Sequence, residues 1–313
     1  MANISANEVF KFVFLCKKTQ AELKDWVTET LRKYYNDIVV GDGYVYAKGT
    51  EVLLTAHLDT VHKEVVKDVD NKVNKKGEVI ISSPQGIGGD DRCGVYMIFR
   101  ILSETEFRPS ILFCEDEEIG GVGRDKFCKT EMIDDLSQLK FLIELDRANK
   151  DDIVFYNDDN VDFHDWVRKV TGYKEAWGTF SDIGNLCPDC GIAGVNISCG
   201  YYHQHTLKEE VNMNEMEASI EATIKLLEKA NEVEQFEYVE HHYHNYGYGY
   251  GYNYDWSTSK RTVWMDVTYI DKNGKTCYAD TYGTNIDSCL VNFMQEHPTL
   301  CWNDIVDYEV YEW

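Results

Sequence analysis

Five short segments of the sequence carry histidines and carboxylates, the side chains that bind divalent metal ions through nitrogen and oxygen. In the first segment His57 and Asp59 are two residues apart, so the Asp59 carboxylate can accept a hydrogen bond from the second ring nitrogen of His57. In the second segment Asp90 follows a glycine-rich turn at residues 86–89. Glycines allow the backbone to turn tightly into a carboxylate that opens a helix.

The other three segments supply further carboxylates and a second imidazole. Glu117 and Glu118 adjoin each other, Asp146 ends an apolar run, and His205 lies in a segment that also offers His203 as an alternative ligand. An isolated pair of such residues is most often a solvated surface feature, especially in a chain this acidic. Their joint order of His, Asp, Glu-Glu, Asp and His instead fits two zinc-like ions that share one carboxylate.

The elements that must position these residues alternate between strand-like and helix-like patterns. Continuous apolar runs predict buried strands that end just before the polar segments, at residues 52–56, 111–114, 141–145 and 193–197. Apolar residues at helical spacing predict helices between them, and two more near the N-terminus, where Thr19 and Glu22 form a capping box. The alternation predicts an α/β fold, a three-layer αβα sandwich with a mixed, largely parallel central sheet. In such sheets, ligands bind at the carboxyl ends of the strands.

In order and spacing, the five segments resemble the motifs of the co-catalytic zinc exopeptidase superfamily, which includes peptidase T, bacterial leucyl aminopeptidases and acetylornithine deacetylase. The resemblance covers residues 5–232. It implies that His57 and Asp146 bind one zinc ion, that Glu118 and His205 bind the other, and that Asp90 bridges the two.

The resemblance also implies roles for neighbouring residues. Asp59 is expected behind His57 as the acid that orients it, and Glu117 as the general base. The peptide bond between Asp90 and Asp91 is often cis in relatives, and residues 181–182 match a segment near the substrate. The segments between the ligands are too short to hold the lid or dimerisation domain that many relatives insert.

The implied function is hydrolysis of an amide or peptide bond by a water that two zinc ions activate. An aminopeptidase or small-peptide exopeptidase fits best, so the expected partner is a small peptide or an amidated small molecule. A deacylase or amidohydrolase of an N-acyl amino acid remains an alternative. The other alternative is a non-catalytic binding protein on the same fold.

The composition changes after residue 232. Residues 1–232 are expected to form the catalytic domain, residues 233–256 a Tyr/Gly/His-rich linker, and residues 257–313 a small ββαβ module. Strands are expected at residues 262–270, 276–282 and 305–311, with a helix at residues 286–295. The histidines of the linker offer at most an adventitious metal site.

Overall charge narrows the possible partners and location. The chain has 31 basic and 55 acidic residues, a formal net charge of −24, which argues against nucleic acid and against an anionic membrane surface. No apolar run is long enough to span a bilayer.

The ten cysteines show no secreted disulfide framework, so we expect a reducing cytoplasm. Cys187 and Cys190 have CxxC spacing, but without a second such pair they are expected to be incidental thiols.

Overall fold

The computed structural model describes residues 4–178, 180–240, 263–272, 275–283 and 305–312, together with residues 289, 293, 297 and 300. The chain divides into two compact units, residues 1–240 and residues 241–313. Among the described residues, no helix is both long and apolar enough to cross a membrane.

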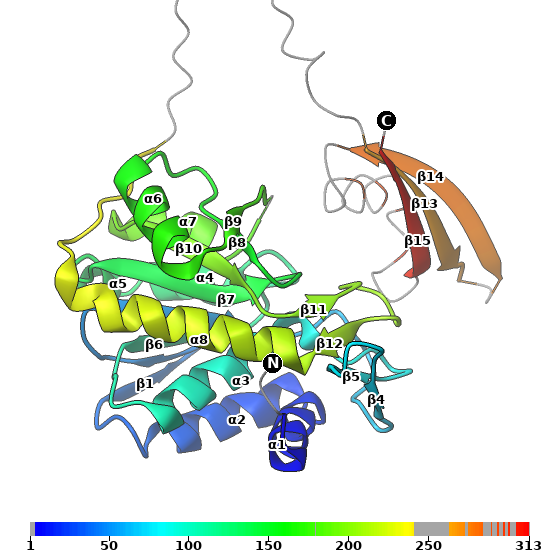
Figure 1. Cartoon of the computed structure of the whole chain (residues 1–313), viewed down its shortest axis with the longest axis horizontal. Helices are drawn as coiled ribbons and strands as arrows, with labels where there is room; N and C mark the ends of the chain where they lie inside the picture. The colour runs from blue at the N-terminus through cyan, green and yellow to red at the C-terminus, as the bar shows by residue number, and fades with distance from the viewer. Residues whose placement is uncertain are drawn as a thin grey trace, which may run out of the picture. The chain divides into compact units, whose positions relative to one another are not determined.

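The first unit contains all the helices and strands that position the candidate site (Figure 1). Its helices are α1 (Ala6–Cys16), α2 (Gln20–Leu31), α3 (Gly89–Glu104), α4 (Val122–Cys128), α5 (Ile133–Leu136), α6 (Val161–Thr171), α7 (Ile183–Cys190), α8 (Met213–Lys229) and the 3-10 turn η1 (Ala230–Glu232). Its strands are β1 (Ile38–Gly41), β2 (Tyr44–Ala47), β3 (Val52–His57), β4 (Asp70–Val73), β5 (Val79–Ser82), β6 (Ser110–Cys114), β7 (Phe141–Arg147), β8 (Asp152–Val154), β9 (Lys174–Glu175), β10 (Gly194–Ser198), β11 (Tyr201–Tyr202) and β12 (Glu210–Asn212).

An eight-stranded sheet forms the centre of the first unit, with the order β1-β2-β6-β3-β7-β10-β8-β9. The four middle strands β6, β3, β7 and β10 run parallel to one another, whereas β2 and β8 join them antiparallel. Parallel strands buried on both faces read as continuous apolar runs, which is how these strands appear in the sequence. The predicted α/β fold with a mixed, largely parallel sheet is confirmed.

Alternate residues of the central strands pack into two separate cores, one on each face of the sheet. On β3, Val52, Leu54 and Ala56 pack with the apolar sides of α1, α2, α3, α6 and α8. Leu53, which points to the opposite face, packs with α4, α5 and α7. Figure 1 shows α3 and α8 running beside each other along the sheet. The sheet therefore lies between two helical layers, as predicted.

The same alternation gives the chemically important side chains one face in common. His57 on β3 is four residues beyond Leu53, so both point toward the layer that contains α7. On β7, Glu144 and Asp146 follow Leu142 at steps of two and point to that face as well. Because β3 and β7 are adjacent and parallel, their carboxyl ends bring these side chains together at one edge of the sheet.

A second sheet of four antiparallel strands, with the order β11-β12-β5-β4, is absent from the sequence prediction. Its strands are two to four residues long and every residue of β4 is exposed, so of the four only β5, at residues 79–81, carries a short apolar run. This sheet matters because β11 and β12 flank the turn at residues 203–209, which carries His205.

The first unit extends beyond residue 232, where the sequence analysis ended the catalytic domain. The backbone N–H of Phe236 donates to Lys140 O at 2.8 Å, and that of Ala193 donates to Phe236 O at 2.9 Å. The Phe236 ring packs against Phe163 and Trp166. Residues 233–240 therefore belong to the first unit, because these contacts hold them against the sheet and α6.

The second unit contains an antiparallel sheet of β13 (Val263–Ile270), β14 (Thr276–Gly283) and β15 (Ile305–Glu312), with the order β14-β13-β15. These three strands lie where the sequence predicts them. Of the predicted helix at 286–295, only Cys289 and Phe293 are described; both are helical and belong to the core of this unit. The remainder of that helix and the Tyr/Gly/His-rich segment from residue 241 onward lie outside the described residues.

Candidate metal centre

Asp90 lies between two histidines that come from opposite ends of the first unit's sequence. Its Oδ1 atom is 2.9 Å from His57 Nε2, and its Oδ2 atom is 3.2 Å from His205 Nε2. His57 ends β3, and His205 lies in the turn between β11 and β12. The two oxygens of one carboxylate thus face two different imidazoles, which is the arrangement required of a bridging ligand.

On one side of Asp90, the imidazole of His57 faces the carboxylate of Asp146 at the end of β7. His57 Nε2 is 3.5 Å from Asp146 Oδ1. Tyr201 donates a hydrogen bond to the backbone oxygen of Asp146 at 3.0 Å, and its hydroxyl is also 3.4 Å from Asp146 Oδ1. His57, Asp90 and Asp146, which the sequence places in one ligand set, are therefore adjacent in space.

On the other side of Asp90, His205 pairs with Glu118, which follows β6. His205 Nε2 is 3.2 Å from Glu118 Oε2, and the ligand atoms of Asp90, Glu118 and His205 all lie within 4.8 Å of one another. Glu118 Oε1 is buried without a hydrogen-bond partner among the described residues, although burial of a carboxylate oxygen demands one. The structure places His205, not His203, in this group.

These separations fit two metal ions. Ligands at about 2.0–2.2 Å from a tetrahedral zinc ion lie about 3.3–3.6 Å from one another. The contacts of His57 with Asp146, at 3.5 Å, and of His205 with Glu118 and Asp90, each at 3.2 Å, are close to that length, whereas that of His57 with Asp90, at 2.9 Å, is shorter. The donors are nitrogen and carboxylate oxygen, which suit zinc and similar divalent ions. The residues present therefore fit a pair of ions bridged by Asp90.

Asp59 supports both His57 and the turn after β6. Its Oδ1 atom is 3.1 Å from His57 Nδ1, the ring nitrogen that faces away from Asp90. The backbone N–H groups of Glu117 and Glu118 donate to its two oxygens at 3.0 Å each. Burial opposes ionisation of Asp59, but the contact with His57 and these amides hold its pKa below the usual value. Asp59 is thus a charged anchor for His57 and for the two adjacent glutamates.

Asp91 also lies beside His57 and Asp146, within the same 4.8 Å limit. Both of its oxygens accept backbone hydrogen bonds. Oδ2 accepts from the N–H of His57 at 3.1 Å, and Oδ1 accepts from the N–H of Gly94 at 2.8 Å. These bonds fix the start of α3 against the end of β3. The peptide bond between Asp90 and Asp91 is cis, as the resemblance predicted.

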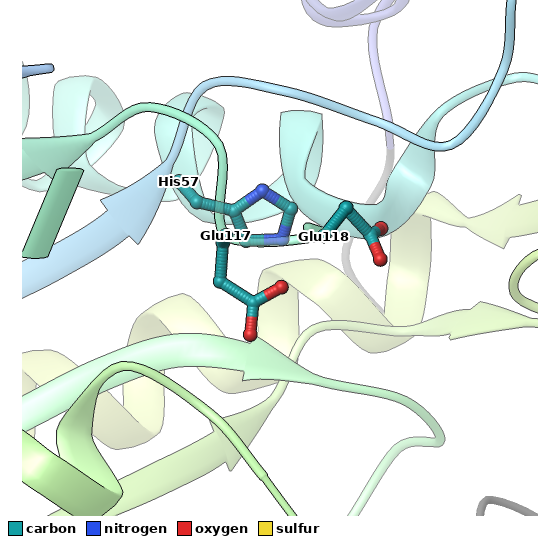
Figure 2. A group of neighbouring side chains, drawn as sticks. All are labelled: His57, Glu117 and Glu118. Carbon is teal, nitrogen blue, oxygen red and sulfur yellow. The ribbon is translucent and has the colours of Figure 1, made fainter. Parts of the chain in front are cut away.

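Glu117 lies beside His57 and Glu118, and one of its carboxylate oxygens is within 4.8 Å of a potential ligand atom of each. Figure 2 shows its carboxylate and that of Glu118 leaving the chain in different directions beside the ring of His57. Glu117 is 8% exposed, and within the described part of the chain its side chain accepts no hydrogen bond. Burial raises the pKa of Glu117 well above its usual value, and nearby carboxylates add to this effect while His57 opposes it. A free carboxylate at this position can accept a proton from a neighbouring water molecule.

The electrostatics show that the cluster holds more negative than positive charge. Burial alone would lower the pKa of each histidine, but the neighbouring carboxylates raise the pKa of both His57 and His205 well above the usual value. Burial, followed by the charge of Asp90, raises the pKa of Asp146 to about 7, and burial also raises the pKa of Glu118. Clustered buried carboxylates are costly unless cations compensate them.

The structure adds residues that the sequence analysis missed. Glu144 is buried and accepts a hydrogen bond from the hydroxyl of Ser181, which is also 3.4 Å from Asp146 Oδ2. Asn196 on β10 donates to Ser181 at 3.2 Å and accepts from the backbone N–H of Asp146 at 3.0 Å. The matched segment at residues 181–182 therefore does lie at the site. Glu144 could have been found from its position two residues before Asp146 on one strand face.

Two further observations concern cysteines near this region. Cys187 and Cys190 are buried on α7, and both are free thiols. No cysteine in the described part of the chain belongs to a group that could hold a metal ion. The CxxC spacing therefore marks neither a disulfide nor a metal ligand in this structure.

The chain is similar to known proteins in structure but not in overall sequence. No protein-family model and no curated protein matches the sequence. Among solved structures, the aminopeptidase PepT of Bacillus cereus matches with a TM-score of 0.57 at 14% identity, covering 72% of this chain and 98% of that one. A tripeptidase of Staphylococcus aureus matches with a TM-score of 0.58 at 13% identity, covering 72% and 98%.

A third match comes from an archaeon. The aminopeptidase APDkam598 of Desulfurococcus kamchatkensis aligns with a TM-score of 0.51 at 14% identity, covering 71% of this chain and 95% of that one. At these identities the likeness concerns the fold, and it extends over nearly the whole length of each peptidase. The chain therefore has the fold of these peptidases, as the resemblance of its five motifs predicted.

Proposed function

We propose that the first unit is a metal-dependent hydrolase that cleaves amide bonds and acts as an exopeptidase on small peptides. One observation carries this proposal: the two oxygens of Asp90 face His57 and His205 at 2.9 and 3.2 Å. Such an arrangement is suited to two cations that share one carboxylate. The fold shared with two aminopeptidases and a tripeptidase supports peptides as the substrate class.

Each residue of the cluster has a role in this proposal. His57 and Asp146 would hold one divalent ion, His205 and Glu118 the other, and Asp90 both. Ions bound there would supply Lewis-acid polarisation of a carbonyl and a more acidic water. Zinc is the expected metal because imidazole and carboxylate donors in this number suit it.

Glu117 would move the proton during hydrolysis. Its carboxylate accepts no hydrogen bond from described residues and is next to Glu118 in sequence, so a neighbouring water can donate to it. After accepting that proton at a carboxylate oxygen, Glu117 would return it to the nitrogen of the leaving amine. Asp59 would keep His57 oriented by accepting a hydrogen bond from Nδ1, which leaves Nε2 directed at Asp90.

The proposal predicts hydrolysis that requires metal. Purified protein loaded with zinc or cobalt should hydrolyse aminoacyl amides or short peptides with a free amino terminus, and a chelator should abolish this activity until metal is restored. N-acyl amino acids serve as the comparison substrates, since faster cleavage of those would favour a deacylase. If metal-loaded protein hydrolyses no amide in either set, the proposed activity is wrong and a binding protein is favoured.

A further inference from the structure

Glu209, a buried carboxylate outside the groups described above, contacts the loop that carries Asp90. Glu209 follows His205 by four residues and is fully buried. Its Oε1 atom accepts from the backbone N–H of Asp90 at 3.0 Å, and its Oε2 atom accepts from that of Gly88 at 2.8 Å. The two oxygens therefore hold two amides on either side of Gly89, more than a hundred residues earlier in the chain.

His62 completes this arrangement from a third segment. Its Nε2 atom is 2.7 Å from Glu209 Oε2, and its side chain is 5% exposed. His62 lies five residues after His57, on the loop that leaves β3. One carboxylate thus joins the loop after the first ligand, the loop of the bridging ligand and the turn of the last ligand.

The glycines of the loop permit this close approach. A Cβ atom at Gly86 would lie 2.2 Å from the ring of His62, and one at Gly89 would lie 2.8 Å from both Tyr201 and Val211. Gly86 also has a φ of +80°, a conformation that favours glycine. The loop is therefore packed tightly onto Glu209 and His62, so a shift of the Glu209 carboxylate would be transmitted to the backbone of Asp90.

We propose that Glu209, supported by His62, is a positioning residue that sets where the Asp90 carboxylate lies between the two histidines. The inference rests on the proposed function, because Asp90 is there the ligand shared by both ions. Residues that orient metal ligands from outside the coordination sphere typically change metal affinity by about 10–100-fold when replaced. Since Asp90 would contact both ions, loss of Glu209 should lower the binding affinity for both ions together.

The test measures binding of cobalt ions to metal-free protein by calorimetry and by visible absorption. Glu209→Gln keeps the shape of the side chain but turns an N–H donor toward a backbone N–H. We expect both ions to bind about 10–100-fold more weakly and the cobalt absorption bands to shift. Glu209→Ala should show the same loss, and either variant suffices if the other fails to fold.

Asp158 provides a matched control within the same unit. It is also a buried carboxylate that accepts two backbone N–H bonds, from Asn160 at 3.1 Å and Val239 at 2.9 Å, and it lies 3.9 Å from a histidine, His164. Asp158→Ala and Glu209→Ala should both lower the unfolding midpoint of the metal-free protein. Only the change at Glu209 should lower cobalt affinity.

His62 gives a second, milder test. His62→Ala should lower the affinity for both ions, as the Glu209 changes do. His62→Gln should bind both ions more tightly than His62→Ala, because the glutamine Nε2 can donate to Glu209 in place of the imidazole. Glu209 variants that bind both ions as tightly as Asp158→Ala would overturn the inference while leaving the proposed function intact. Wild-type protein that takes up neither cobalt nor zinc would overturn both.

Discussion

Glu117→Gln is expected to lower turnover by about two to four orders of magnitude, the usual contribution of general acid–base catalysis. The glutamine amide has the shape of the carboxylate but cannot accept the proton of a water. Glu117 has no side-chain hydrogen bond within the described residues, so the fold should not depend on its charge. Metal content and unfolding midpoint should therefore match the wild type, while kcat falls for every substrate that is cleaved.

A neighbouring acid offers the control for this prediction. Glu115 lies in the same turn after β6 but forms an ion pair with Lys24 at 2.5 Å, away from the ligand cluster. Glu115→Gln should leave kcat unchanged, because its carboxylate pairs with Lys24 and belongs to none of the described groups that could hold a metal ion. Equal turnover by wild type and Glu117→Gln, measured on a substrate whose hydrolysis needs metal, would show that Glu117 is not the base.

Asp90→Asn should have the second large effect, the loss of tight binding at both ion positions. The asparagine keeps one oxygen but presents an NH₂ group to the other position, and it removes the negative charge shared by the pair. Affinity for each ion should fall by more than the roughly 10–100-fold expected for residues outside the coordination sphere. Titration of metal-free protein with zinc or cobalt, followed by calorimetry, measures both steps.

The other ligand carboxylates make this prediction specific. Glu118→Gln should lower affinity for the ion beside His205 more than for the other ion, since among the described residues Asp90 alone has carboxylate oxygens within 3.2 Å of both imidazoles. Asp146→Asn should lower the affinity only for the ion beside His57. Asp90 is not the bridging residue if Asp90→Asn lowers the affinity for only one ion. The same holds if Asp90→Asn, Glu118→Gln and Asp146→Asn all change the two affinities equally.

Much of this fold could be predicted from the sequence because buried parallel strands have a clear signature. The apolar run Val52–Ala56 and its counterparts on β6, β7 and β10 need no partner information to be recognised. The polar residue that follows each run marks the edge of the sheet where ligands bind. His57, Asp146 and the two glutamates after β6 could thus be assigned to one site from the order of residues alone.

Other parts could not be predicted because their strands or contacts depend on distant segments. β4 is exposed along its whole length, and β11 has two residues, so neither has an apolar pattern. The role of Glu209 depends on two amides that lie more than a hundred residues earlier in the chain. Likewise, Phe236 lies beyond the composition break, and only its packing against Phe163 and Trp166 assigns it to the first unit.

The most direct test of the central claim is anomalous X-ray diffraction from crystals grown with zinc and measured at its absorption edge. We predict two peaks in the first unit about 3.5–4 Å apart, the usual spacing of paired catalytic ions. One should lie between His57 and Asp146 and the other between His205 and Glu118, with Asp90 contacting both. A single peak, or peaks that avoid Asp90 despite full occupancy elsewhere, would contradict the account.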